Sequence, residues 1–189
     1  MIIELLVGKI CELVTMSAAN IDLILSSAHQ KEYSKGQCIL GEGQICNYLF
    51  FVEKGYLRTY INQDGKEINT GFTFEGNFTS NLQSLKKQEP SEFTIEAGEK
   101  SVVTFLNKDK LLEMYSRSSE IEVFGRRILG KLVLENIEYL NFCKLLSPKE
   151  RYRYLMEKNL QIIQRVPVSQ LSSYIGVARE TLSRIRKKV

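Results

Sequence analysis

Close to its C-terminus the chain carries two arginines, a glutamate and a serine that one helix face could hold together. If this segment is helical, ~100° per residue places Arg179, Glu180, Ser183 and Arg184 within about 140° of arc. Arginine can donate two hydrogen bonds to guanine, and glutamate can accept one from the amino group of cytosine. Such a face is suited to reading bases in the major groove of DNA.

The residues before this helix predict the element that would position it. Leu171 and Ile175 give a short helix a buried face, Gly176 supplies a tight turn, and the second helix begins at about Ala178. This order is the helix-turn-helix pattern. A solvated helix is the alternative, and it leaves Gly176 and the preceding short helix unexplained. The expected DNA-binding residues are Ser169, Arg179, Glu180, Ser183 and Arg184, with Lys187 and Lys188 as phosphate contacts.

The charge of the chain is unevenly distributed. Its 189 residues carry a net charge of +4, yet residues 143–189 hold 11 Lys/Arg against 3 Asp/Glu. Residues 1–142 hold 15 against 19. A structured basic block is the electrostatic footprint of a nucleic-acid-binding module. Charge alone leaves open the alternative of a solvated basic face.

A long amphipathic helix is predicted from about Ser119 to Phe142, and its apolar surface is wide. One stripe contains Ile121, Phe124, Ile128, Leu132 and Tyr139, and an adjoining stripe contains Leu129, Val133, Ile137 and Leu140. Such width indicates two packing partners, the rest of the chain and a second copy of the same helix. The first stripe is the expected dimer interface. The alternative is a helix that only covers its own core.

Two short helices, residues 2–15 and 20–29, are predicted to open the chain. Short strands are predicted between them and the long helix. From about Tyr33 to Leu106, runs of β-branched and aromatic residues alternate with glycine-containing turns, which suggests a sandwich, barrel or jelly roll. Asp64-Gly65 predicts a two-residue hairpin turn. After the long helix, Ser147, Pro148 and Glu150 predict the start of another helix that runs to about Gln164.

The order of these elements and several motifs resemble the CRP/FNR transcription regulators. The similar motifs are Gly41-Glu42-Gly43, Leu49 to Gly55, Asp64-Gly65-Lys66-Glu67, Gly76-Asn77-Phe78 and Arg179 to Ile185. The resemblance implies an α+β fold with a cyclic-nucleotide-binding-like β-roll and flanking helices (1–118), a dimerisation helix (119–142) and a helix-turn-helix domain (143–189). It also implies a cytoplasmic homodimer that binds double-stranded DNA at an inverted repeat, with a small-molecule effector and RNA polymerase as further candidate partners.

The sequence departs from the nucleotide-binding members of that family. In those members a Gly-Glu pair and a later Arg-Ser pair hold the ribose and the cyclic phosphate, whereas Ser80-Asn81 and Ser91-Glu92 stand in these places here. A charge-assisted hydrogen bond is worth ~1.5 to 3 kcal/mol, and a carboxylate would repel phosphate, so we expect no binding of cyclic AMP or cyclic GMP.

An effector, if one binds, is expected in a pocket made by these four residues and their apolar neighbours. The candidate residues are Phe72, Phe74, Phe78, Ser80, Asn81, Leu82, Ser91 and Glu92. The apolar neighbours Phe72, Phe74, Phe78 and Leu82 favour a less polar molecule over a phosphate. The alternative is that these rings are simply core.

No enzyme activity, metal or cofactor is expected. The only histidine, His29, cannot build the histidine-rich metal site of similar β-rolls, and no G-x-S-x-G is present. Cys11, Cys38, Cys46 and Cys143 are scattered without a C-x-x-C pair, so reduced thiols and no iron–sulfur cluster are expected.

The opening residues carry Glu4 and no basic residue before their apolar stretch, unlike a secretory signal, and no segment approaches a membrane span. A cytoplasmic protein without a membrane partner is therefore expected. The remaining alternative is a protein–protein regulator whose helix-turn-helix is a docking module. Such a module should not be retained on heparin and should show no response in a salt titration on DNA.

Overall fold

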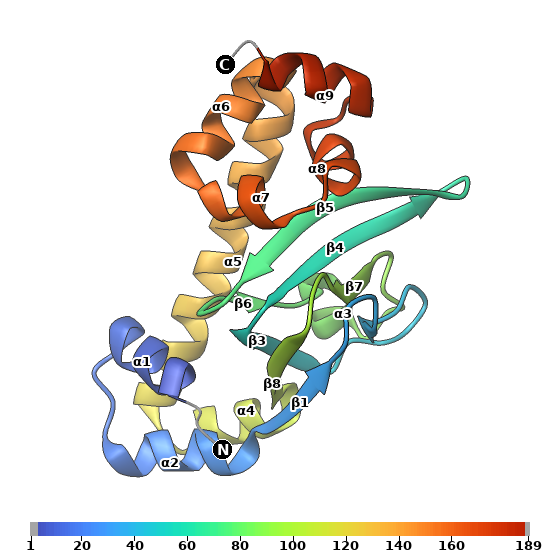
Figure 1. Cartoon of the computed structure of the whole chain (residues 1–189). Helices are drawn as coiled ribbons and strands as arrows, with labels where there is room; N and C mark the ends of the chain where they lie inside the picture. The colour runs from blue at the N-terminus through green and yellow to red at the C-terminus, as the bar shows by residue number, and fades with distance from the viewer. Residues whose placement is uncertain (1–3, 188–189) are drawn as a thin grey trace.

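The computed structural model describes residues 4–187 and combines a β-roll with helices at both of its ends (Figure 1). Two antiparallel sheets have the strand orders β1-β8-β3-β6 and β2-β7-β4-β5. The predicted α+β fold is confirmed. The strands are His29–Tyr33 (β1), Cys38–Leu40 (β2), Tyr48–Lys54 (β3), Tyr56–Gln63 (β4), Lys66–Phe74 (β5), Phe78–Thr79 (β6), Thr94–Ala97 (β7) and Ser101–Asn107 (β8).

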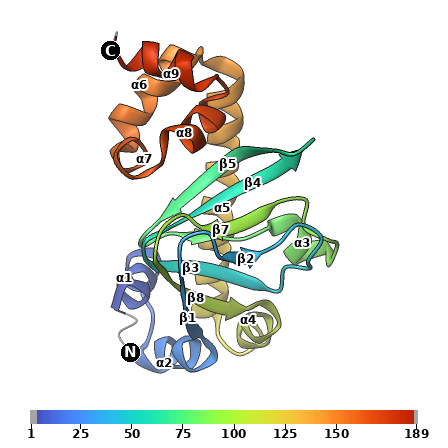
Figure 2. The same cartoon turned by 45° about the vertical axis from the view of Figure 1, so that its right-hand side comes forward.

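The β4–β5 hairpin shows why the turn could be predicted from two residues. Gln63 pairs with Lys66, and both residues between them have positive φ, 52° at Asp64 and 79° at Gly65. A type I′ turn requires this conformation, which glycine adopts without strain. The hairpin extends beneath the C-terminal helices, and β5 is the outer strand of its sheet (Figure 2).

Helices flank the β-roll and form the C-terminal part of the chain (Figure 1). They are Glu4–Leu13 (α1), Ala18–Ser27 (α2), Leu82–Lys87 (α3), Lys108–Tyr115 (α4), Ser119–Leu145 (α5), Pro148–Lys158 (α6), Leu160–Arg165 (α7), Val168–Ile175 (α8) and Arg179–Arg186 (α9). Helix α5 begins at the predicted residue, where the Ser118 side chain accepts a hydrogen bond from the amide of Ile121, and it passes beside both sheets (Figures 1 and 2).

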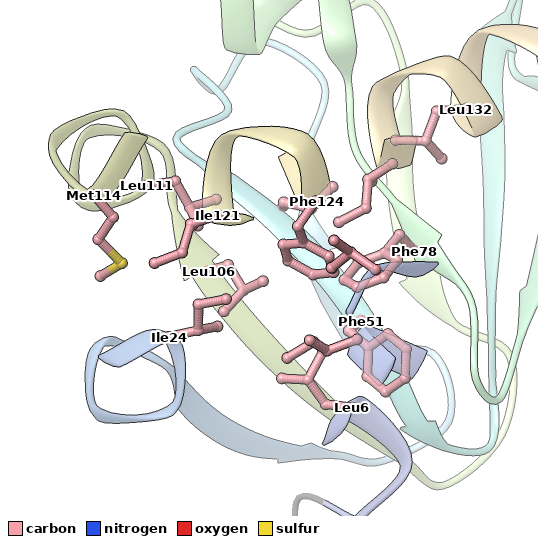
Figure 3. Close-up of a cluster of buried hydrophobic side chains, with 14 residues drawn as sticks. Leu6, Ile24, Phe51, Phe78, Leu106, Leu111, Met114, Ile121, Phe124 and Leu132 are labelled. Carbon is pink, nitrogen blue, oxygen red and sulfur yellow. The ribbon is translucent and has the colours of Figure 1, made fainter. Parts of the chain in front are cut away.

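The first apolar stripe of α5 packs inside its own chain. Ile121, Phe124, Ile128 and Leu132 are at most 6% exposed and belong to one core cluster with Phe51, Phe78 and side chains of α1, α2 and α4 (Figure 3). Tyr139 lies nearer the C-terminal end of the helix and packs against the cluster that holds the C-terminal helices. The predicted dimer contacts of Ile121, Phe124, Ile128 and Leu132 are therefore wrong, because these side chains are already buried. The contact of the half-buried Tyr139 stays a prediction.

The adjoining stripe of α5 is the one that remains open. Leu129, Val133, Ile137 and Leu140 are between 44% and 51% exposed, and Leu134 beside them is 60% exposed. At ~100° per residue this stripe is centred roughly 140° around the helix from the buried one. Helix α5 thus has one apolar face for its own chain and a second without a partner among the described residues.

The start of α6 follows the predicted pattern, but its end does not. The Glu150 carboxylate accepts a 2.8 Å hydrogen bond from the amide of Ser147, as in a capping box. The single helix expected to about Gln164 is divided at Asn159, whose φ of −148° and ψ of 69° lie outside the helical region. This break gives the separate short helix α7.

Among residues 4–187, no helix is long and apolar enough to cross a membrane, and no group of three His, Cys, Asp or Glu side chains could hold a metal ion. The four cysteines are free thiols. His29 stacks on Phe105 at 4.7 Å between ring centroids.

Candidate nucleic-acid interface

Helices α8 and α9 form the predicted helix-turn-helix. Leu171 and Ile175 are fully buried, as is Leu182 on α9. Gly176 ends α8 with a φ of 80°, and its amide donates to the carbonyl of Ser172 at 2.9 Å. A glycine is suited to this position because a side chain would be strained at such a φ.

Arg151 of α6 fixes the turn from outside. Its guanidinium donates to the carbonyl of Ile175 at 2.8 Å and to the carbonyl of Phe142 at 3.1 Å, and so joins the end of α8 to the end of α5. A Cβ atom at Gly176 would lie 3.2 Å from this guanidinium. Sequence reasoning missed Arg151, because its partners are backbone groups without a residue-type signature.

The predicted reading face of α9 is exposed. Arg179, Glu180, Ser183 and Arg184 all face solvent, whereas Leu182 is buried and Ile185 half-buried. In the described part of the chain Glu180 forms no ion pair with either arginine, so its carboxylate is available as an acceptor. The face therefore presents donors and an acceptor in the arrangement expected from the sequence.

The other predicted DNA-binding residues flank this face. Ser169 is exposed in the first turn of α8, and Lys187 is exposed just after α9. Lys188 lies outside the described residues. Each of the described residues in the predicted set can thus be reached from solvent.

The helix-turn-helix is docked on the β-roll through α8. The Ser173 hydroxyl accepts a 3.0 Å hydrogen bond from the amide of Asn69 and donates a 3.0 Å hydrogen bond to the carbonyl of Glu67. Next to it, the Tyr174 ring packs edge-on against Phe72 at 5.2 Å and stacks with Tyr139 at 5.2 Å. The first helix of the helix-turn-helix is therefore joined to β5 by both polar and aromatic contacts.

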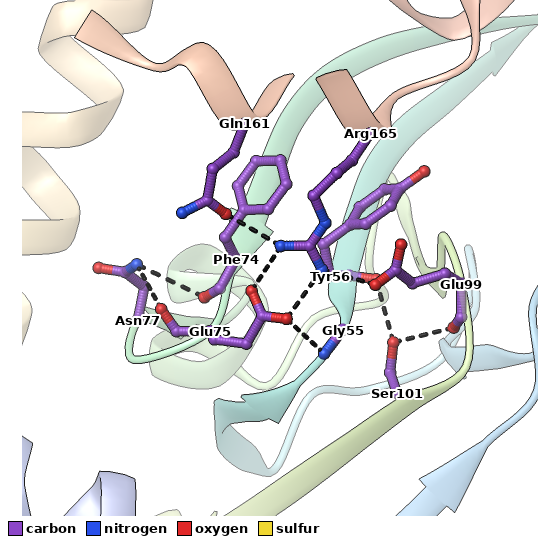
Figure 4. Close-up of polar contacts among 9 residues, drawn as sticks. All are labelled: Gly55, Tyr56, Phe74, Glu75, Asn77, Glu99, Ser101, Gln161 and Arg165. Atoms are coloured by element: carbon purple, nitrogen blue, oxygen red, sulfur yellow. Dashed lines mark hydrogen bonds and ion pairs between the residues drawn. The ribbon is translucent and has the colours of Figure 1, made fainter. Parts of the chain in front are cut away.

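A second contact between the two parts centres on Arg165, at the end of α7 (Figure 4). Its guanidinium donates to both carboxylate oxygens of Glu75, at 2.7 and 2.8 Å, and to Glu99 at 2.5 Å. It also lies over the Phe74 ring, 5.1 Å from the centroid. We call Arg165, Glu75 and Glu99 the Arg165 latch. Its members lie 66 and 90 positions apart, so no local pattern could have revealed them.

We expect Arg165→Ala to loosen the C-terminal helices from the β-roll. The change removes three charge-assisted hydrogen bonds, and because the side chain is 27% exposed we expect a loss of about 1 to 2 kcal/mol in unfolding free energy. Urea unfolding and amide exchange in β5 should detect it. Arg153→Ala, in an exposed arginine of α6, is the matched control, and an equal effect of both variants would contradict the latch.

Acid should weaken the same contact. Burial acts in the opposite direction, but the Arg165 guanidinium holds the pKa of Glu75 below its ordinary value. Because the pKa is lower in the folded chain, this stabilisation is complete above the ordinary value of 4.5 and is lost as the pH falls through the lowered value.

The residues that stand where nucleotide-binding relatives hold the ribose and phosphate form hydrogen bonds within this chain. The Asn81 amide donates to the Ser91 hydroxyl at 2.8 Å, and both residues are at most 4% exposed. The Asn81 carbonyl oxygen also accepts from the amide of Ser84 at the start of α3. Glu92 points to solvent and Ser80 donates to the carbonyl of Tyr48, so of these four residues only Asn81 and Ser91 bind each other.

The residues predicted as an effector pocket do not form one site. A cavity of about 580 Å³ lies between β5, α5 and the C-terminal helices, and of the eight residues only Phe72, Phe74 and Ser80 line it. Phe78 and Leu82 belong to the first core cluster. Phe74 is buried and Phe72 half-buried in the cluster that holds the C-terminal helices, so both rings also take part in core packing.

One family model and one curated protein match part of the chain in sequence. Residues 30–118 match the family model of the cyclic nucleotide-binding domain. The cAMP-activated global transcriptional regulator Vfr of Pseudomonas aeruginosa is 29% identical over 112 residues, which cover 57% of this chain and 52% of Vfr. The match thus spans about half the length of that curated relative.

Solved structures match most of the chain in fold. FixK2 from Bradyrhizobium japonicum has a TM-score of 0.72 at 16% identity, covering 85% of this chain and 83% of FixK2. The c-di-GMP responsive global regulator CLP of Xanthomonas campestris has a TM-score of 0.70 at 19% identity, with 91% of each chain covered. A crp/fnr family regulator from Eubacterium rectale reaches 0.67 at 20% identity, covering 92% of this chain and 83% of that one. At these identities the likeness concerns the fold.

Proposed function

Since the chain carries a cyclic nucleotide-binding domain and fits the CRP/FNR family, we propose that it is a dimeric, sequence-specific DNA-binding regulator of transcription. In this proposal residues 1–118 sense a signal, the helix that begins at Ser119 dimerises and residues 143–189 bind DNA. The single observation that carries it is the exposed reading face of α9, supported from behind by Leu182.

The open stripe of α5 supports the dimer. Four apolar side chains about half exposed, at helical spacing, are what a second copy would bury. Gly130 lies at the side of this stripe, and a Cβ atom there would meet nothing within 4 Å, so a second helix could approach closely. A parallel pair would carry its two reading helices on one side, which requires an inverted-repeat operator with half-sites about one helical turn, ~34 Å, apart.

Selection of bound sequences from random DNA tests the function directly. The full chain should enrich an inverted repeat, and its affinity should fall steeply with salt, because phosphate contacts release counterions. Enrichment of no sequence, together with indifference to heparin and salt, would instead identify the helix-turn-helix as a protein-docking module.

We further propose that the chain does not respond to cyclic AMP. Asn81 and Ser91 satisfy each other where a phosphate would need an arginine, and burying a phosphate there would break their hydrogen bond without replacing the missing charge. Calorimetry with cyclic AMP and cyclic GMP should show no micromolar affinity, and DNA affinity should be unchanged by either. Micromolar binding of either nucleotide would refute this prediction.

A further inference from the structure

The cavity between the β-roll and the C-terminal helices is large enough for a small molecule. Its volume of about 580 Å³ lies in the usual range for ligand sites, ~300 to 1,000 Å³. Its walls come from β4, β5, α5, α6 and α8, so a ligand inside would contact both the β-roll and the helix-turn-helix. Ser80 lines it, whereas Asn81, Ser91 and Glu92 do not, so only one of the four residues at the place of the ribose and cyclic phosphate reaches this cavity.

One wall of the cavity is aromatic. Tyr174 stacks with Tyr139 at 5.2 Å and with Phe142 at 5.4 Å, and Phe142 packs against Tyr154 at 5.8 Å. Burial raises the pKa of Tyr139 and of Tyr174, so both phenols stay protonated and uncharged. In the described chain the hydroxyls of Tyr154 and Tyr174 have no hydrogen-bond partner. The wall offers ring faces for an apolar group and hydroxyls for a polar one.

The exposed part of the lining carries charges of both signs. Glu138 of α5 and Lys158 of α6 line the cavity, and neither forms an ion pair with a residue that the structure describes. Glu135 also lines it, but Lys131 lies 3.7 Å away and counters its charge. Lys131 in turn donates to Asn77 at 2.8 Å and does not line the cavity. One free carboxylate and one free ammonium group therefore remain, on different helices.

We propose that this cavity binds a zwitterionic amino acid with an aromatic or large apolar side chain. The side chain packs on the ring wall, the ligand's ammonium group faces Glu138 and its carboxylate faces Lys158. A fully anionic ligand would meet Glu135 and Glu138, and a simple amine would leave Lys158 uncompensated. If the chain is the proposed regulator, this amino acid is its effector. That role rests on the proposed function, whereas binding to the cavity does not.

The test uses three probes that share one ring and differ in charge. L-phenylalanine carries both charged groups, phenethylamine lacks the carboxylate and 3-phenylpropionate lacks the amine. Calorimetry on the DNA-free full chain should show L-phenylalanine binding about tenfold more tightly than either truncated probe.

Charge-neutralising variants then assign each group. Glu138→Gln should weaken L-phenylalanine and phenethylamine by about three- to tenfold and leave 3-phenylpropionate unchanged, and Lys158→Gln should do the reverse. Glu157→Gln and Lys149→Gln, in charged residues of α6 that do not line the cavity, are the matched controls. All four changes are at exposed positions, and thermal melting of each variant confirms that it folds.

Three outcomes would overturn the inference. These are no heat with L-phenylalanine up to roughly millimolar concentrations, equal affinity for the truncated probes, and variants that behave like their controls. Because binding is measured without DNA, failure of the chain to bind DNA would remove the proposed function and leave this result standing. Failure to bind L-phenylalanine would leave DNA recognition untouched.

Discussion

Arg179→Ala and Arg184→Ala should each weaken binding to the preferred operator by ~1 to 3 kcal/mol and relax specificity at one base pair in each half-site. Both arginines are exposed on α9 whereas Leu182 is buried, so either side chain can be removed without disturbing the core. Each change would remove the bidentate contact to guanine proposed for that arginine, which a different base could not make. Affinities for the selected duplex and for single-base variants of it give the measurement.

Lys187→Ala provides the comparison. Lys187 is exposed beyond the end of α9 and is expected to contact phosphate, so its loss should weaken specific and scrambled duplexes alike and flatten the salt dependence. Titrations at several salt concentrations separate the two classes of contact. If both arginine variants lose specific and non-specific binding in equal proportion, these arginines contact phosphate and the assigned reading face is wrong.

Ile137→Glu should convert the proposed dimer to a monomer. Ile137 is 47% exposed in the centre of the open stripe of α5, and two-fold symmetry would bring two introduced carboxylates into one apolar interface. Desolvating these charges should cost roughly 3 kcal/mol, about a hundredfold in the dissociation constant. Sedimentation at micromolar concentration should show the change, and affinity for an inverted repeat should fall to that for a single half-site.

Leu23→Glu is the matched control, because Leu23 is an exposed leucine, 37% accessible, on the separate helix α2. It should leave the oligomeric state unchanged. A wild-type chain that sediments as a monomer, with and without DNA, would contradict the proposed dimer. A dimer that tolerates glutamate at position 137 would place the interface elsewhere.

The sequence was most informative where function depends on neighbouring residues. The helix-turn-helix could be predicted because its determinants, from Leu171 to Leu182, lie within a dozen positions and follow helical spacing. The hairpin at Asp64-Gly65 could be predicted for the same reason, since two residues determine the turn. The periodicity of α5 also predicted both of its apolar stripes.

The sequence could not show which apolar face of α5 packs against its own chain, nor which distant residues contact each other. The spacing in α5 is identical for a stripe that faces its own core and one that faces a partner, so only the packing of Phe124 against Phe78 distinguishes them. The Arg165 latch joins residues that are distant in the sequence. The break at Asn159 and the short helix α3 escaped prediction because neither segment shows an extended apolar period.

The docking of Ser173 on β5 bears on the solubility of the chain. An outer strand leaves backbone groups unpaired, and such an edge can recruit a strand from another molecule. Here one hydroxyl satisfies the amide of Asn69 and the carbonyl of Glu67, and the Tyr139 hydroxyl donates to the carbonyl of Asn69 at 3.4 Å. Any state in which the helix-turn-helix leaves the β-roll uncovers this edge, so undocked chains should self-associate through β5 at high concentration. Helix α8, which covers this edge, should therefore also protect the chain from aggregation.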